Sequence, residues 1–141
     1  MEILILNGPN LNLLGIRQPE IYGHRSFEQF YLELKEGYPN DTLHYYQSNH
    51  EGALIDKLQE IGFEFDGIVF NPGGYTHTSI AIRDTISSIT TPVVEVHISD
   101  IYQRETFRHH SYVKDVAIES IVGQGLNGYK KAIDILKTPS E

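Results

Sequence analysis

Short apolar stretches recur along the chain at a nearly constant interval. They start at Ile3, Leu43, Ile68, Val93 and Ile118, and the last four start 25 residues apart. Such stretches are typical of buried strands in a parallel sheet, because each parallel strand needs a crossover connection long enough for a helix. The pattern predicts five strands, at residues 3–6, 43–46, 68–70, 93–96 and 118–122.

Between these stretches, apolar residues recur at the spacing of amphipathic helices. Ser26 and Gln29 form a capping box that marks the start of the first helix. The apolar faces comprise Phe27, Phe30, Tyr31 and Leu34, then Leu54, Leu58 and Ile61, then Ile82, Ile86 and Ile89, and finally Leu126, Tyr129, Ile133 and Leu136. The interval at residues 101–113 is polar, and we predict one short helix there.

Buried strands that alternate with helices form parallel sheets with right-handed crossovers and helices on both faces. Five such strands predict an α/β, flavodoxin-like three-layer αβα sandwich, with a five-stranded parallel sheet of order 2-1-3-4-5. A chain of 141 residues buries a sizeable core without disulfides or metals. We therefore predict a single domain over residues 1–141.

The first interval is longer than the others, and the excess falls between Gly8 and Arg25. This stretch contains Gly15, Pro19 and Gly23 and shows no clear periodicity. Long loops of this kind in compact domains are often active-site lids. We predict a lid at about residues 15–25, and the alternative is an insertion without a function.

Polar residues follow the predicted strands, at the edge of the sheet where ligands bind in folds of this kind. The strand-end segments are residues 7–10, 47–50, 71–74, 97–100 and 123–125. Their amides, hydroxyls and histidines favour a polyhydroxylated or carboxylated small molecule over a metal ion. Residues 123–128 read GxGxxG but lack the acidic residue that a dinucleotide site places about 20 residues later, so we expect close helix–strand packing there.

The composition excludes several classes of function. The sequence has no cysteine, which rules out disulfides, thiolate zinc sites and a cysteine nucleophile. The net charge of -8 argues against binding to nucleic acid, which depends on neutralising phosphates. No apolar run approaches the roughly 20 residues of a membrane span, and the N-terminus lacks the basic start of a signal peptide. We therefore expect a cytoplasmic protein without a membrane partner.

The arginines are grouped. Arg17, Arg83, Arg104 and Arg108 lie in or beside the predicted loops above the strands. In an acidic protein this placement favours a site for a small anion. Scattered surface arginines are the alternative, and composition alone does not decide between the two.

Glu95 and His97 lie two residues apart on one predicted strand, so their side chains point to the same face. His97 ends the strand and reaches the ligand edge, with a carboxylate behind it. A carboxylate partner fixes the tautomer of an imidazole and favours its protonated form, which suits a general acid or base. The alternative is a structural histidine that only makes a hydrogen bond.

The predicted lid contains Arg17 and Tyr22. A free tyrosine has a pKa of about 10, so a tyrosine that acts as a base at neutral pH needs a cation within about 4–6 Å. Arg17 is one candidate for that cation, and Arg104 or Arg108 is a second. The alternative is a lid tyrosine that only packs against the site.

Five segments, taken in order, resemble the type II 3-dehydroquinate dehydratase family of the shikimate and quinate pathways. They are NGPNLNLLG with the lid RQPEIYG, QSNHEG, FNPGGYTHTSIAIRD, VVEVHIS, and RETFRHHSY with the IVGQGLNGY that follows. Together they extend over nearly the whole chain. Gln18 departs from the glutamate expected between the lid arginine and proline, which concerns lid contacts rather than the chemistry.

The resemblance implies that 3-dehydroquinate loses water to give 3-dehydroshikimate, by anti elimination through an enol or enolate. It implies that Tyr22 is the base and that Arg17 stabilises its anion. It also implies that His97 is the general acid, oriented by Glu95. Asn10 matches the asparagine that holds a water near the enolate oxygen, an oxyanion-hole role. The matched substrate-binding positions are Asn71, His77, Ile98, Ser99, Arg104 and Arg108.

The resemblance further implies trimers grouped into dodecamers, in which Asp84 reaches the site of a neighbouring subunit. The reaction needs no cofactor and no metal, because the ketone already acidifies the neighbouring C–H bond. It differs from the unrelated way to dehydrate the same substrate, which forms an imine and requires a lysine in the site. No lysine follows a predicted strand. Two alternatives stay open: a flavodoxin-like binding or regulatory module, and another small-molecule enzyme, such as a nucleotide or phosphosugar hydrolase.

Overall fold

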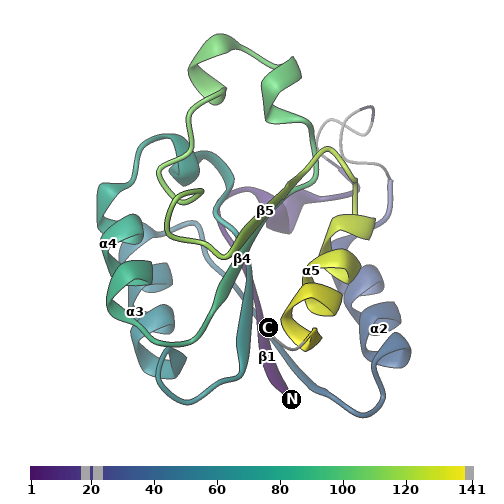
Figure 1. Cartoon of the computed structure of the whole chain (residues 1–141). Coiled ribbons are helices and arrows are strands. Elements are labelled where there is room, and N and C mark those ends of the chain that lie inside the picture. Colours follow the sequence, from purple (N-terminus) through teal and green to yellow (C-terminus); the bar gives the residue numbers. More distant parts are fainter. Residues whose placement is uncertain (17–19, 21–23, 139–141) are drawn as a thin grey trace.

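The computed structural model describes residues 1–16, 20 and 24–138, which form a sandwich of three layers (Figure 1). In this described part, five parallel strands lie in the order β2-β1-β3-β4-β5. The strands are β1 (Glu2–Asn7), β2 (Thr42–Gln47), β3 (Gly67–Asn71), β4 (Val93–His97) and β5 (Glu119–Val122). The strand order and direction confirm the predicted flavodoxin-like α/β fold.

Helices cover both faces of the sheet (Figure 1). On one face lie α2 (Phe27–Gly37) and α5 (Asn127–Lys137). On the other face lie α3 (Glu51–Ile61) and α4 (Ile80–Ser88). The apolar residues that predicted these helices are the ones that pack against the strands, so each helix buries the stripe seen in the sequence.

Strand β1 lies between β2 and β3 and is buried on both faces of the sheet. Ile3 and Ile5 pack with α2 and α5, whereas Leu4 and Leu6 pack with α3 and α4. Complete burial of such a side chain contributes about 1.5–3 kcal/mol to the free energy of unfolding. Burial on both faces explains why the strand is continuously apolar rather than alternating.

Two local predictions are confirmed at the helix starts. Ser26 Oγ accepts a hydrogen bond from the backbone N–H of Gln29, and the Gln29 side chain accepts one from Ser26, which completes the capping box. In the GxGxxG segment, a Cβ on Gly128 would lie 3.3 Å from Val96 Cγ1. Glycine at this position therefore lets α5 approach β4 closely.

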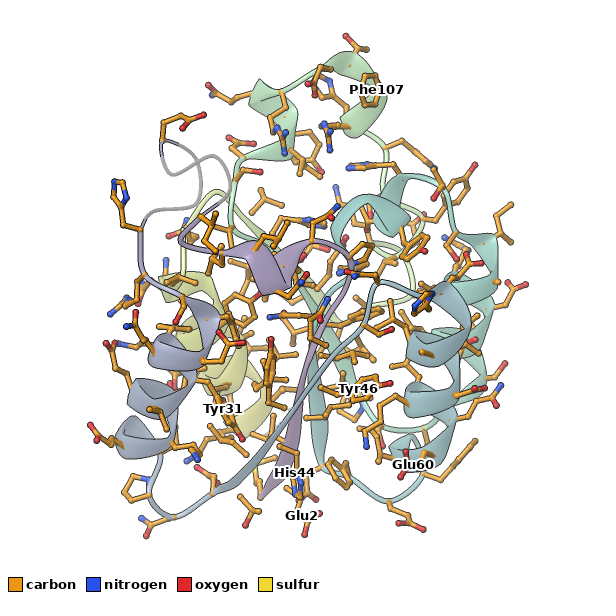
Figure 2. All side chains as sticks on the ribbon, turned by 180° about the vertical axis from the view of Figure 1, so that it is seen from behind. Glu2, Tyr31, His44, Tyr46, Glu60 and Phe107 are labelled. Carbon is orange, nitrogen blue, oxygen red and sulfur yellow. The ribbon has the colours of Figure 1, made fainter. Side chains whose placement is uncertain are left out.

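The connection between β4 and β5 differs from the prediction. Residues 101–113, all of which are described, contain two 3-10 helices, η3 (Ile101–Gln103) and η4 (Thr106–Arg108), instead of one short helix. Arg104 separates them, because its extended backbone, with φ −104° and ψ −166°, cannot continue a helix. Figure 2 shows Phe107 at the tip of this segment, which stands above the strand ends.

The predicted lid at about residues 15–25 is covered only in part. Residues 17–19 and 21–23 lie outside the described residues, and with them Arg17, Gln18 and Tyr22. Between β1 and this stretch, η1 (Leu11–Leu13) begins the connection. Within the part of the chain that is described, no helix is both long enough and apolar enough to cross a membrane.

Candidate active site

A pocket with a volume of about 150 Å³ opens at the carboxyl ends of β1, β3 and β4. This is the sheet edge where ligands bind in doubly wound α/β folds. Among the described residues, it is lined by Pro9, Asn10, Leu11, Asn71, Gly73, Gly74, His77, His97, Ile98, Ser99, Ile101, Arg104 and Arg108.

The loops that follow β1 and β3 pack against each other and form one wall. The backbone N–H of Gly8 donates to Asn71 O at 2.7 Å. A Cβ on Gly8 would lie 2.4 Å from Pro72 O, so a larger residue would force the loops apart. Asn10 follows in a left-handed conformation, with φ 70°, and its backbone N–H donates to Asn49 Oδ1 at 3.0 Å. These contacts hold Asn10 at the pocket.

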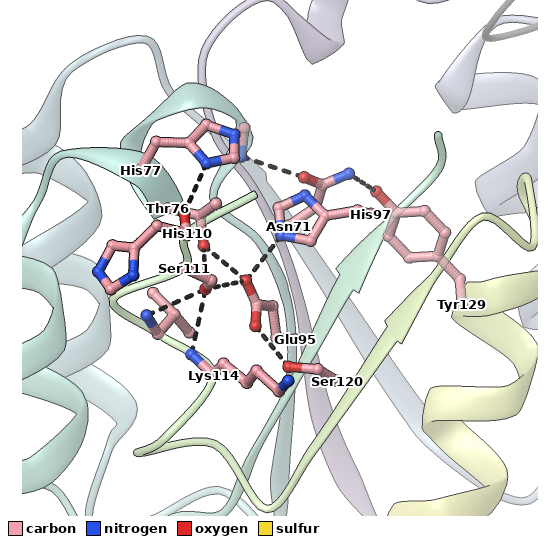
Figure 3. Close-up of polar contacts among 12 residues, drawn as sticks. Asn71, Thr76, His77, Glu95, His97, His110, Ser111, Lys114, Ser120 and Tyr129 are labelled. Atoms are coloured by element: carbon pink, nitrogen blue, oxygen red, sulfur yellow. Dashed lines mark hydrogen bonds and ion pairs between the residues drawn. The ribbon is translucent and has the colours of Figure 1, made fainter. Parts of the chain in front are cut away.

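The side chain of Asn71 is oriented by a buried hydrogen-bond network (Figure 3). Its Nδ2 donates to Tyr129 Oη at 3.0 Å, and Tyr129 Oη donates to Asn7 Oδ1 at 2.8 Å. Asn71 Oδ1 accepts from the backbone N–H of Gly73 at 3.1 Å. Burial raises the pKa of Tyr129, so the phenol stays neutral and keeps its proton to donate. Both ends of the Asn71 amide are thus fixed, and one N–H is left for a ligand.

Glu95 and His97 meet on one face of β4, as their spacing predicted (Figure 3). Glu95 Oε2 lies 2.6 Å from His97 Nε2, and the two residues are 1% and 5% exposed. Burial by itself raises the pKa of Glu95, but the hydrogen bond and charge of His97, with hydrogen bonds from Ser120 and Thr76, hold this pKa well below its usual range. Glu95 is therefore an anion, and the hydrogen between the pair belongs to His97 Nε2.

His77 is the second histidine of the pocket and ends η2 (Gly73–His77). The centres of the His77 and His97 rings are 6.4 Å apart. His77 Nδ1 donates to His110 O at 2.8 Å, because a carbonyl oxygen can only accept. Burial lowers the pKa of His77. The ring is therefore neutral near pH 7, and its Nε2 offers a hydrogen-bond acceptor.

The segment at residues 101–113 contributes the pocket's positive charge. Of the described arginines, Arg104 and Arg108 line the pocket, and Arg108 Nε also donates to Glu105 Oε2 at 2.5 Å. Arg83 is not part of the site: it lies in α4, and its Nη1 donates to Tyr112 O at 2.9 Å. The grouping of arginines seen in the sequence therefore reduces, in the described residues, to a pair beside the pocket.

Most of the candidate residues from the sequence come together here. Those that line the pocket are Asn10, Asn71, His77, His97, Ile98, Ser99, Arg104 and Arg108. Glu95 lies directly behind His97. Asp84 is exposed on α4 and does not line this pocket. Arg17 and Tyr22 lie outside the described residues.

Sequence reasoning missed the hydroxyl groups that surround Glu95. Thr76 Oγ1 and Ser111 Oγ donate to its Oε2 at 2.5 and 2.8 Å, and Ser120 Oγ donates to its Oε1 at 2.5 Å. Ser120 had a signal, because it pairs with Glu95 in the register of β4 and β5 and therefore faces the same way. Thr76 and Ser111 reach Glu95 from connecting segments, and no spacing rule links such segments to β4.

The arrangement suits acid–base chemistry on a small anionic compound. The guanidinium groups of Arg104 and Arg108 favour an anion, and the amide of Asn71 suits a hydroxyl. His97, backed by a buried anion, can deliver a proton to a leaving group. No lysine is among the described residues that line the pocket. None of these residues can therefore form an imine with a ketone substrate.

Comparison with known proteins places the chain in one family. The family model for dehydroquinase class II matches residues 1–137. A 3-dehydroquinate dehydratase of Exiguobacterium sp. is 54% identical over 137 residues, which are 96% of this chain and 94% of that protein. A catabolic 3-dehydroquinase of Penicillium rubens is 48% identical over 135 residues, which are 94% of this chain and 87% of that protein.

The solved structures agree with the sequence comparison. The crystal structure of type II dehydroquinase from Butyrivibrio crossotus matches with a TM-score of 0.95 and 51% identity, and the match covers 98% of each chain. Because the family model spans almost the whole sequence and the relatives match over nearly their full length, this chain belongs to the class II dehydroquinase family.

Proposed function

We propose that this protein removes water from 3-dehydroquinate to give 3-dehydroshikimate, a step of the shikimate pathway of aromatic amino acid biosynthesis. The observation that carries the proposal is the His97–Glu95 pair, 2.6 Å apart, at a pocket lined by Arg104 and Arg108. Elimination of a hydroxyl from a small carboxylate needs a proton donor beside an anion site. The Exiguobacterium relative is a 3-dehydroquinate dehydratase and the Penicillium relative is a catabolic 3-dehydroquinase, which supports this substrate.

His97 is the proposed general acid. Glu95 is ionised and can only accept, so His97 Nε2 keeps its hydrogen throughout. The proton for the departing hydroxyl then comes from Nδ1, on the other side of the ring, when the ring is an imidazolium. The buried Glu95 anion stabilises that imidazolium and fixes its orientation.

Tyr22 is the proposed base, and Arg17 is proposed to stabilise its anion, on the resemblance of the RQPEIYG segment. Tyr22 takes the proton next to the ketone, and the electron pair moves onto the ketone oxygen to form an enolate. A water held by Asn10 stabilises this oxygen, and Arg104 adds positive charge on the lid side. As the ketone re-forms, the C–O bond breaks and the hydroxyl leaves as water with the proton from His97, on the face opposite the base.

The other pocket residues are proposed to bind the substrate. Arg108 and the backbone of Ile98 and Ser99 face its carboxylate and hydroxyl groups. Asn71 offers the N–H that its own network leaves unused, and His77 offers Nε2 as an acceptor for a hydroxyl. Each group is presented by a strand end or by the segment that follows it.

We also propose, from the family resemblance, that the protein forms trimers grouped into a dodecamer and acts in the cytoplasm. Asp84 is proposed to reach the site of a neighbouring subunit. Asp84 is exposed on α4 and does not line its own pocket, which supports that role. No cofactor or metal is required by the proposed chemistry, because the substrate's ketone provides the acidity of the C–H bond.

The proposed function is tested by mixing the purified full-length protein with 3-dehydroquinate in the presence of a chelator. We expect the ultraviolet absorbance of a conjugated enone carboxylate to rise with time. Mass spectrometry should show a product lighter than the substrate by one water. A folded protein that leaves the substrate unchanged would contradict the proposal and favour a binding module on the same fold.

A further inference from the structure

Glu95 is held by side chains from separate parts of the fold (Figure 3). Among the described residues, its donors are His97 on β4, Thr76 on η2, Ser111 after η4, and Ser120 on β5. Three of them converge on Oε2, at 2.5 to 2.8 Å, and Ser120 alone reaches Oε1. A carboxylate bound on both oxygens by groups from different elements has a fixed rotation as well as a fixed charge.

The directions of these hydrogen bonds follow from counting hydrogens. Ser111 Oγ accepts from the backbone N–H groups of Val113 and Lys114, at 3.2 and 3.1 Å, which occupies its two lone pairs. Its single hydrogen is therefore free to point to Glu95. Thr76 Oγ1 lies 2.9 Å from Ser111 Oγ but finds no lone pair there, so its hydrogen also points to Glu95. Neither hydroxyl takes a hydrogen from the carboxylate, and ionised Glu95 has none to donate, so the hydrogen between Glu95 Oε2 and His97 Nε2 belongs to His97.

The same hydroxyls connect β4 to the segments that carry other pocket residues. Thr76 directly precedes His77, and Ser111 directly follows His110. These segments are joined to each other, because His77 Nδ1 donates to His110 O at 2.8 Å and the backbone N–H of Tyr112 donates to Thr76 O at 2.7 Å. Glu95 is thus the point at which the loops around His77 and Arg108 meet the strand that carries His97.

We propose that Thr76, Ser111 and Ser120 are positioning residues for the reaction, which act through Glu95 to fix the tautomer and orientation of His97. This inference rests on the proposed function, in which His97 is the general acid. The hydroxyls do not line the pocket, so their effect falls on the rate of proton delivery and not on the binding of the substrate.

The test uses the two hydroxyls that can be removed with least disturbance. Ser111 also binds two backbone groups, so its removal would disturb the loop, whereas Thr76→Val keeps the shape of the side chain and Ser120→Ala removes one atom. We expect each variant to lower kcat by about 10- to 100-fold, with KM within about three-fold of the wild type, because a misplaced catalytic group loses rate at that scale. Thr76→Ser and Ser120→Thr restore the hydroxyls and should restore most of kcat.

Two further variants separate positioning from general packing. Thr91→Val is the matched control, because Thr91 is also buried but its Oγ1 donates to Phe65 O at 2.9 Å rather than to Glu95. It should leave kcat unchanged. The double variant Thr76→Val with His97→Asn should be no slower than His97→Asn alone, because Thr76 acts through His97. Losses that multiply in the double variant, or folded single variants with the kcat of the wild type, would overturn the proposal.

A spectroscopic measurement keeps this inference separate from the proposed function. In protein with ¹⁵N-labelled histidine, the His97 signals are identified by their absence in His97→Asn. We expect hydrogen on Nε2 of His97 in the wild type, and displaced His97 signals in Thr76→Val but not in Thr91→Val. Unchanged signals in Thr76→Val would overturn the positioning role even if 3-dehydroquinate is turned over. A wild type without turnover would overturn the proposed function, whatever the His97 signals show.

Discussion

Replacing Tyr22 by phenylalanine is expected to lower kcat by about 10²- to 10⁴-fold, because a general base contributes a rate factor of that size. The phenyl ring keeps the shape of the side chain, and the missing oxygen acts on the transition state more than on the bound substrate. The dissociation constant of the product 3-dehydroshikimate, measured by calorimetry, should therefore change by no more than a few-fold. The rate is followed by enone absorbance in saturating 3-dehydroquinate.

The matched control for this substitution is Tyr46→Phe. Tyr46 lies on β2 and does not line the pocket, so loss of its hydroxyl should leave kcat unchanged. If Tyr22→Phe retained most of the wild-type kcat, Tyr22 would not be the base. The proton next to the ketone would then have to be taken by another group.

Replacing His97 by asparagine is expected to lower kcat by about 10²- to 10⁴-fold, because the hydroxyl then leaves without a proton donor. Substrate binding should change much less, since Arg104, Arg108 and Asn71 still line the pocket. Removal of one partner of a buried ion pair also destabilises a protein, in general by about 3–5 kcal/mol. The free energy of unfolding must therefore be measured beside kcat and KM, so that the loss of rate is read only from folded protein.

The matched control is His44→Asn. His44 lies on β2, and Figure 2 shows it at the end of the molecule opposite Phe107, which lies in the segment at residues 101–113. Its replacement should leave kcat within two-fold of the wild type. A folded His97→Asn protein with unchanged kcat would remove His97 from the role of acid and leave the alternative of a structural histidine.

The fold was predictable because its inner strands β1, β3 and β4 are buried on both faces and its helices are buried on one. Complete burial makes a strand such as β1 continuously apolar. The three- and four-residue spacing of Leu54, Leu58 and Ile61 indicates one buried face of a helix. The two short helices η3 and η4 were not predictable in this way. Each is a single turn set by local contacts, such as Asp100 accepting from the backbone N–H of Tyr102, and a single turn has no periodicity.

The candidate site was predictable where it depends on strand geometry. Alternation along β4 places Glu95 and His97 on one face, and parallel strands bring Asn71 and His97 to one edge. The hydroxyls of Thr76 and Ser111 were not predictable, because serine and threonine are common in loops and their contacts with Glu95 depend on the folded path of two connections. A charged residue in the middle of a buried strand was itself a sign that such donors had to exist.

The proposed chemistry removes water by acid–base catalysis, without an imine between substrate and protein. The direct measurement is to incubate the protein with 3-dehydroquinate and borohydride, remove the small molecules, and determine the remaining activity and the intact mass. A parallel sample lacks the substrate. We expect both samples to keep equal activity and an unchanged mass. Loss of activity only in the presence of substrate, together with a mass increase by one reduced substrate molecule, would contradict the proposed chemistry.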